Sequence, residues 1–229
     1  MRRCVGELAD SDIPLGILPA GTANLLAKNL DIPISLDGAL KVALHGDERR
    51  LDVGVMNGER FAVMAGTGFD ALLIGGADRL KGRWGQLSYI WSGVRASGVD
   101  PAQARIKADG LPWFNGELSC LLIGNVSTVM GRLEVFPDAR PDDGRLDVGV
   151  VQARRRSQWL GLLARVAGHR QEASPLVQTT TATRIRVQLD RPLPWEADGG
   201  DRKPTDHYKI DIESAALAVR VPPGGPSRR

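Results

Sequence analysis

The chain has 229 residues, of which 42% are hydrophobic and 25% are charged, so it can fill a core and is neither a disordered nor a fibrous sequence. This length fits one large domain or two small ones. The formal net charge of +3 favours approach to phosphate or to an anionic bilayer surface, but it is too small to indicate a nucleic-acid partner.

The first 50 residues combine helix signals with one strand signal. We expect a helix from Arg2 to Ala9 and another from Gly38 to His45, which ends at Gly46. Between them, the apolar run from Leu15 to Leu18 predicts a buried strand. Such a segment is at most half of a doubly wound α/β unit and cannot bury its faces alone. We therefore predict that residues 1–50 are an incomplete α/β domain.

A tight turn joins that predicted strand to the next helix. Pro19 ends the strand pattern, Gly21-Thr22-Ala23-Asn24 forms the turn, and an apolar helix begins at Leu25. The backbone N–H groups at such a helix start lack partners, and a glycine lets a ligand approach closely. The Thr22 hydroxyl and the Asn24 amide add side-chain partners, so the turn is suited to phosphate. Packing alone explains many strand–glycine–helix turns, and that alternative stays open.

From residue 51 onward, short strands and turn signals dominate. Asn57-Gly58 predicts a two-residue hairpin between Asp52–Met56 and Arg60–Ala65. Residues 66–70 are expected to form a glycine-rich loop. Apolar residues at helical spacing from Trp84 to Val94 predict a helix, which is more typical of a core than of a membrane anchor.

The remainder predicts more strands and one further helix. Asp109-Gly110 and Asn115-Gly116 are turn signals, and Arg154–Ala167 is an amphipathic helix whose arginines favour solvent, with an interfacial lipid contact as the alternative. Strands are expected at 104–108, 118–124, 146–151, 183–189, 193–197, 207–212 and 218–221. We predict an antiparallel β-sandwich with one or two helices over residues 51–221, followed by a disordered tail, 222–229.

Cysteine usage and hydropathy bear on where the protein works. Cys4 and Cys120 have neither a disulfide framework nor zinc spacing, and free thiols suit a reducing cytosol. No apolar stretch approaches the roughly 20 residues that span a bilayer. We expect a cytoplasmic protein, peripheral to the membrane, with no transmembrane segment and no nucleic-acid partner.

Four stretches occur together in a more specific order than any one of them alone. They are Gly21–Asn24, the segment from Leu51 to Gly68, Phe136–Asp147 and Trp195–Asp201. In this order they resemble the bacterial diacylglycerol kinase family of soluble lipid kinases, which is related to the sphingosine kinases. The resemblance runs from Arg2 to Pro222 and implies an ATP-binding domain in 1–50 and a lipid-binding, catalytic β-sandwich in 51–221.

The resemblance also assigns roles to the nucleotide site and to the base. It implies that Gly21, Thr22 and Asn24 contact the phosphates of ATP. Asp198 falls on the family's Asp-Gly-Glu motif and would be the base for the lipid hydroxyl. The residues themselves leave a simpler alternative, because Asp198-Gly199 is also an ordinary hairpin turn.

Metal ligands are implied in the same way. Asp52 resembles the acidic residue of the family's Mg²⁺ network, and Asp143 matches a structural metal site completed by backbone carbonyls around Arg140 and Arg145. A strand-edge ion pair is the alternative for Asp52. A plain type I turn is the alternative for Asp143. The cofactors implied are ATP and Mg²⁺, whose chemistry suits phosphoryl transfer.

The chain departs from the family's pattern at three places. Gly200 replaces the Glu of the Asp-Gly-Glu motif, with Glu196 or Asp201 as substitutes within reach, and Leu25 stands where many relatives have Asp. The family's main phosphate loop, Gly-Gly-Asp-Gly-Thr, would lie directly before Met1, so we expect the gene to encode roughly 80–100 further residues upstream.

The function that the resemblance implies is ATP- and Mg²⁺-dependent phosphorylation of diacylglycerol to phosphatidic acid. Two alternatives stay open at this point. One is a kinase of another lipid, such as a sphingoid base. The other is a non-catalytic module that binds lipid or forms a homodimer, and we expect the chain as given to be inactive if the front phosphate loop is absent.

Overall fold

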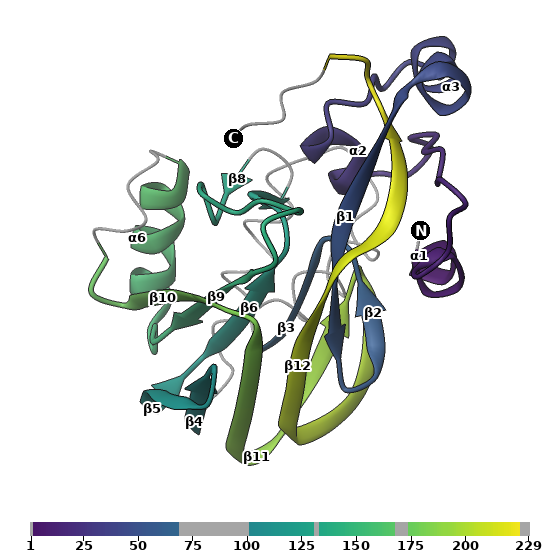
Figure 1. The fold of residues 1–229 in the computed structure, drawn as a ribbon. Coiled ribbons are helices and arrows are strands. Elements are labelled where there is room, and N and C mark those ends of the chain that lie inside the picture. Colours follow the sequence, from purple (N-terminus) through teal and green to yellow (C-terminus); the bar gives the residue numbers. More distant parts are fainter. Residues whose placement is uncertain (1, 69–100, 131–132, 168–173, 225–229) are drawn as a thin grey trace.

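The computed structural model describes residues 2–68, 101–130, 133–167 and 174–224. Its main element is a ten-stranded sheet in which every pairing is antiparallel. Helices α1 (Arg2–Leu8), α2 (Leu25–Asn29) and α3 (Leu36–His45) lie on the side of the molecule formed by β1 (Asp47–Met56) and β12 (Gly200–Val221), as Figure 1 shows. Helix α6 (Arg156–Ala167) lies on the other side.

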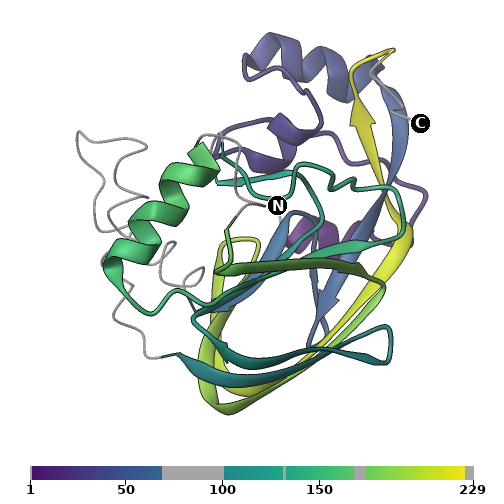
Figure 2. The same cartoon turned by 90° about the vertical axis from the view of Figure 1, so that its left-hand side faces the viewer.

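The sheet curls around a closed interior, which is visible in Figure 2. Its strand order is β10-β9-β6-β3-β11-β12-β1-β2, and β4 pairs with both β11 and β5. The remaining strands are β2 (Glu59–Phe61), β3 (Met64–Gly68), β4 (Ala102–Ala108), β5 (Leu111–Leu118), β6 (Cys120–Gly124), β7 (Thr128–Met130), β8 (Leu133–Glu134), β9 (Leu146–Val151), β10 (Val177–Ala182) and β11 (Arg184–Ala197). The expectation of an antiparallel, sandwich-like sheet with few helices is confirmed.

The N-terminal segment adds helices to this sheet but no strand of its own. The predicted strand at Leu15–Leu18 is wrong. Only Leu15 forms a parallel bridge to Val219, donating its N–H to Ala218 and accepting from Arg220. Prolines precede and follow this short run at positions 14 and 19, and each removes a backbone donor, so a longer ladder cannot form.

Two long strands replace four predicted ones. β11 and β12 each continue through positions where the alternation of apolar and polar residues breaks off in the sequence. In the structure such a break is a shift in strand register, as between Gln188 and Leu193, and not a turn. Asp198 (φ 44°) and Gly199 (φ 79°) form the two-residue turn that joins them. The β1–β2 hairpin at Asn57-Gly58 is confirmed, while the predicted domain boundary at residue 50 falls inside β1, and the division into domains stays a prediction.

Two predicted loops are strands in the structure. Residues 66–68, expected to be a glycine-rich loop, lie in β3 and are fully enclosed by β6 and β11. Asn115-Gly116, expected to be a turn, lies within β5. The helix predicted at Trp84–Val94 and the end of the predicted tail, 225–229, lie outside the described residues.

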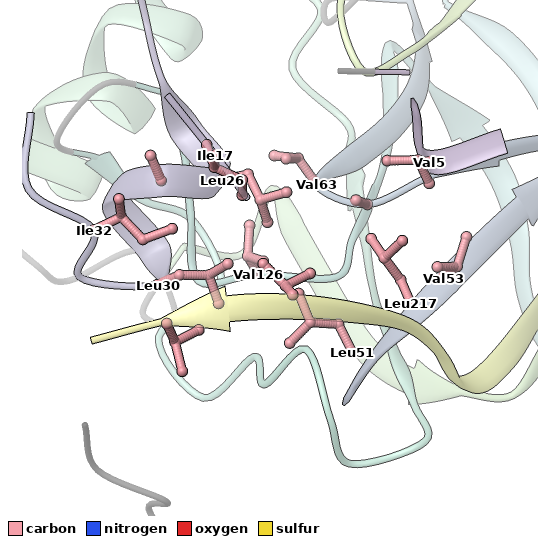
Figure 3. Packing of buried hydrophobic residues seen from close by; sticks show 14 of the residues in the cluster. Val5, Ile17, Leu26, Leu30, Ile32, Leu51, Val53, Val63, Val126 and Leu217 are labelled. Atoms are coloured by element: carbon pink, nitrogen blue, oxygen red, sulfur yellow. The ribbon is translucent and has the colours of Figure 1, made fainter. Parts of the chain in front are cut away.

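The buried side chains form two large clusters. One packs the N-terminal helices against β1 and β12, and Figure 3 shows Leu26 of α2 beside Ile17, and Leu30, which follows α2, near Val126. The other fills the interior of the curled sheet. In a third, smaller cluster, Trp159 of α6 packs with the buried Cys120. Helix α3 is an exception to this packing of large apolar side chains, because it buries only Ala39 and Val42 and exposes Leu36, Leu40 and Leu44.

Candidate functional site

The turn before α2 is closed by its own asparagine. Asn24 has a left-handed backbone (φ 50°), and its Oδ1 accepts a hydrogen bond from the Gly21 N–H at 2.8 Å. Gly21 and Thr22 are exposed, and the Thr22 hydroxyl makes no hydrogen bond to the residues that the structure describes. The turn therefore offers the Thr22 hydroxyl to a ligand, while the N–H of Gly21 already has a partner.

Asp198 lies at the tip of the β11–β12 hairpin and binds the connection between β2 and β3. Its Oδ2 accepts from the N–H of Ala62 (2.8 Å), and its Oδ1 accepts from the N–H groups of Val63 (3.0 Å) and Met64 (3.1 Å). Burial raises the pKa of Asp198 by more than the three N–H donors lower it, so the pKa lies above its ordinary value. A carboxylate offers about four acceptor positions, so one position on Oδ2 stays open beside the Ala62 bond.

The segment that holds Asp198 packs into the same core as the turn before α2. Ala62, Val63 and Met64 belong to the cluster that contains Ile17 and Leu26, which flank that turn. Figure 3 shows Val63 beside Ile17 and Leu26. The base predicted from the sequence and the predicted phosphate turn are thus attached to one apolar core.

Asp52 is nearly enclosed, at 2% exposure, and binds two loops. Its carboxylate accepts from the N–H of Gly144 (2.6 Å) and from the N–H of Ala215 (2.8 Å). Its own N–H donates to the carbonyl of Pro141 at 2.6 Å. The alternative of an ion pair with Arg50 or Arg60 is wrong, because those arginines pair with other carboxylates.

Asp143 stands in the loop that Asp52 holds. Its Oδ1 accepts from the N–H of Arg145 at 3.0 Å, as in an Asp-Gly turn. Partial desolvation, together with the charges of Asp52 and Asp142, raises the pKa of Asp143, although Arg140 and the Arg145 N–H oppose this. The Arg145 guanidinium points away to Thr181, with its Nε 2.9 Å from the hydroxyl oxygen.

Asp147, which sequence reasoning did not single out, belongs to the same acidic group. Burial raises its pKa to about 6, and the charges of Asp143 and Asp138 contribute. Within the described ranges, no group of three His, Cys, Asp or Glu side chains is arranged to hold a metal ion. Carboxylate oxygens are the donor type that a hard cation prefers, and a divalent charge beside them would lower the raised pKa values of Asp143 and Asp147.

Asn125 is a second residue that the sequence did not reveal, and it connects the backbone at Asp52 with the segment that the Asp198 carboxylate binds. Its side-chain Nδ2 donates to the carbonyls of Asp52 (2.9 Å) and Ala62 (3.0 Å), and its N–H donates to the carbonyl of Val63 (2.9 Å). The residue is 1% exposed, and its Oδ1 has no partner among the described residues. An asparagine after an apolar strand carries no local signature, so only the fold identifies it.

The two proposed substitutes for the missing Glu differ in environment. Glu196 is fully buried on β11, opposite Gly66 and Asp201. Asp201 is exposed. In the described part of the chain, no helix is long and apolar enough to cross a membrane.

Comparison with known proteins agrees with this architecture. The family model described as "YegS C-terminal NAD kinase beta sandwich-like domain" matches residues 63–221, and the model described as "Diacylglycerol kinase catalytic domain" matches residues 1–56. A diacylglycerol kinase structure from Bacillus anthracis str. Sterne shares the fold, with a TM-score of 0.75 at 21% identity over 96% of this chain and 73% of that one.

Two curated relatives match almost the whole chain. "Probable lipid kinase YegS-like" of Pseudomonas aeruginosa (strain UCBPP-PA14) is 32% identical over 94% of this chain and 70% of its own length. "Lipid kinase YegS" of Escherichia coli (strain K12) is 30% identical over 99% of this chain and 74% of its own length. With this identity and coverage, and with a matched family model over most of its length, the chain belongs to the family of YegS-like lipid kinases.

Proposed function

We propose that the protein is a lipid kinase that transfers the γ-phosphoryl group of ATP to the hydroxyl of diacylglycerol and gives phosphatidic acid. The observation that carries the proposal is the Asp198 carboxylate. It is held by three backbone donors, keeps one acceptor position open, and is attached to the core that also anchors the turn before α2. Phosphoryl transfer needs a carboxylate that orients the attacking hydroxyl beside bound phosphates.

Asp198 would orient the lipid hydroxyl and accept its proton. The direction of its pKa shift supports this role, because a pKa moved toward neutrality makes a carboxylate a better proton acceptor. Gly21, Thr22 and Asn24 would contact the nucleotide phosphates, with the exposed Thr22 hydroxyl as the donor that is free to turn toward them. The three backbone bonds would hold the Asp198 carboxylate in one orientation before substrate arrives.

Mg²⁺ would neutralise charge on the transferring phosphoryl group and would be held by carboxylates of this chain. The proposed structural site consists of Asp143 and the carbonyls around Arg140 and Arg145. Asp147 is near enough for the charge of Asp143 to raise its pKa. Asp52 supports the same loop through Gly144, and a ligand role for it stays a prediction. Peripheral membrane association and a homodimer also stay predictions.

The test is radiolabelled phosphate transfer from ATP to diacylglycerol in neutral detergent micelles, with and without EDTA. It uses the chain as given and a form extended by whatever coding sequence lies upstream. Asp198→Asn is expected to lower transfer by about 10²–10⁴-fold. Lys203→Gln, at an exposed position of the same hairpin, is the matched control and should leave transfer unchanged.

Folding must be separated from chemistry, because Asp198→Asn also removes an acceptor from Ala62. Thermal unfolding and binding of a fluorescent ATP analogue are therefore measured on each variant. A folded, nucleotide-binding Asp198→Asn variant with full transfer would refute the role of Asp198. Transfer to a sphingoid base but not to diacylglycerol would change the substrate, and no transfer to any lipid hydroxyl by either form would overturn the proposal.

A further inference from the structure

The outer surface of β4, β11 and β12 carries an unusual arrangement of cations. Ile106, Val187 and Tyr208 point into the interior of the curled sheet, so their strand neighbours point outward. We call these outward positions the basic face: Gln103, Arg105, Lys107, Arg184, Arg186, Gln188, Asp190, His207, Lys209 and Asp211. Strand register sets Lys107 directly opposite Arg186, and Arg186 directly opposite Lys209.

Three like charges in one row across three neighbouring strands oppose folding, since directly opposed like charges destabilise a sheet. Arg186 is relieved by Asp211, at 2.9 Å. Lys107 and Lys209 have no ion pair among the described residues, and both are exposed. The basic face has five lysines and arginines against two carboxylates, a formal charge of +3 over ten positions. It therefore carries a local excess of positive charge.

A hollow lies over the centre of this row. Its volume is about 380 Å³, and Arg186, His207 and Lys209 line it. The Asn57 side chain fixes its rim, because its Nδ2 donates to the carbonyl of His207 (3.1 Å) and its Oδ1 accepts from the N–H of Lys209 (2.8 Å). Val187, Gln188 and Tyr208 complete the lining, which is mostly apolar, so the cations stand around the hollow rather than inside a polar pocket.

The partner that fits best is a bilayer rich in anionic phospholipid. A lipid surface presents many phosphates in a plane, which matches a sheet face with its cations spread over three strands. The ten outward positions include no Phe, Tyr or Trp on which a nucleic-acid base could stack. Each lysine or arginine near an anionic leaflet contributes favourably to binding. Binding to such a membrane would therefore offset the repulsion among Lys107, Arg186 and Lys209.

We propose that the basic face docks the protein on anionic membranes, with the row of Lys107, Arg186 and Lys209 facing the phospholipid phosphates. This inference rests on the proposed function in one respect, since a kinase of diacylglycerol must work at a bilayer. The surface is separate from the residues assigned to phosphoryl transfer.

The test is co-sedimentation of the full chain with phosphatidylcholine vesicles that contain or lack phosphatidylglycerol. Wild-type protein is expected to bind the anionic vesicles, to release them as salt increases, and to ignore neutral vesicles. The double variant Lys107→Glu/Lys209→Glu should bind anionic vesicles about 100-fold more weakly, from the usual effect of each charge near such a surface. It should fold normally, because both new carboxylates stand opposite Arg186.

The matched control is Arg3→Glu/Lys41→Glu, which changes the net charge equally at exposed positions of α1 and α3. The control is expected to bind like wild type. Equal loss in both double variants, or no loss in Lys107→Glu/Lys209→Glu, would overturn the proposal. Tighter binding to a duplex or single-stranded oligonucleotide than to anionic vesicles, lost in the same variant, would overturn it in favour of nucleic acid.

The kinase assay in neutral micelles separates this inference from the proposed function. Lys107→Glu/Lys209→Glu should retain wild-type transfer there, where no anionic surface is present. Vesicle binding without transfer would refute the proposed function and leave the docking surface standing. Transfer in micelles with no preference for anionic vesicles would refute the docking surface alone.

Discussion

Asp52 offers the sharpest test of how the site is built. Replacement by alanine leaves the N–H groups of Gly144 and Ala215 without their acceptor, and Asp52 is only 2% exposed, so water cannot easily take its place. An unsatisfied buried donor costs about 1–3 kcal/mol. Two of them give about 4 kcal/mol for Asp52→Ala, a large part of the stability of an ordinary domain.

The measurement is equilibrium urea unfolding in EDTA, with the slope of the transition checked for each variant. Asp142→Ala is the matched control in the same loop. Its carboxylate accepts from the Nε of Arg49 at 2.9 Å, but it is about a third exposed, at 34%. A surface pair of this kind contributes about 0.2–1 kcal/mol, so the control should stay close to wild type.

The outcome distinguishes a structural carboxylate from a metal ligand. A loss for Asp52→Ala no larger than that of Asp142→Ala, in EDTA, would refute the hydrogen-bonding argument. If the loss appeared only when Mg²⁺ was present, Asp52 would act chiefly through a cation. Asp52→Asn, which keeps one acceptor oxygen, should lose about half as much as Asp52→Ala.

Two further variants test neighbouring parts of the structure. Burial raises the pKa of Asp147 to about 6. Between about pH 4 and 6 the native state therefore binds more protons than the unfolded state, so this residue lowers the free energy of unfolding as pH rises through that window. Asp147→Asn should therefore gain about 1–2 kcal/mol over wild type in EDTA at pH 7.5 and nothing at pH 4, by urea unfolding; an equal gain at both pH values would contradict this. Gly68→Ala should lose about 3 kcal/mol or more, because a Cβ there would lie 2.2 Å from the Ser119 carbonyl oxygen, whereas Gly58→Ala, with a similar φ and open space, should lose about 1 kcal/mol. Equal losses at the two glycines would show that backbone conformation, and not the contact, decides the cost.

The sequence predicted best what local chemistry decides. Asn57-Gly58 and Asp109-Gly110 are turns because both residues of each pair adopt positive φ at low cost. Helix α3 ends at His45, before Gly46, as predicted; Ser35 is its N-cap residue, although its side chain makes no capping hydrogen bond. The prediction of a loop at residues 66–68 is wrong because glycine in a sequence usually indicates a turn. Here Gly68 lies within β3, and the close approach of the backbone beside β6 leaves no space for a side chain.

The site residues divide in the same way. Motif order makes Asp198, Asp52 and Asp143 candidate site residues, but it does not predict the partners that define their environment. Asp52 receives donors that lie 92 and 163 residues away in the chain, and no periodicity reports such a bond. The raised pKa of Asp147 likewise depends on burial and on neighbouring loops, which only tertiary structure supplies.

Asn125 explains how the two ends of the site can act as one unit. The strand connection at Ala62 and Val63 is bound on its N–H side by Asp198 and on its carbonyl side by Asn125, which also binds the carbonyl of Asp52. Because buried networks lose more than pairwise sums when one member is removed, a disturbance of the Asp52 loop is expected to reach Asp198 through this connection. We therefore expect the orientation of the proposed base to depend on the hydrogen bonds of Asn125 and of Asp52 as well as on its own.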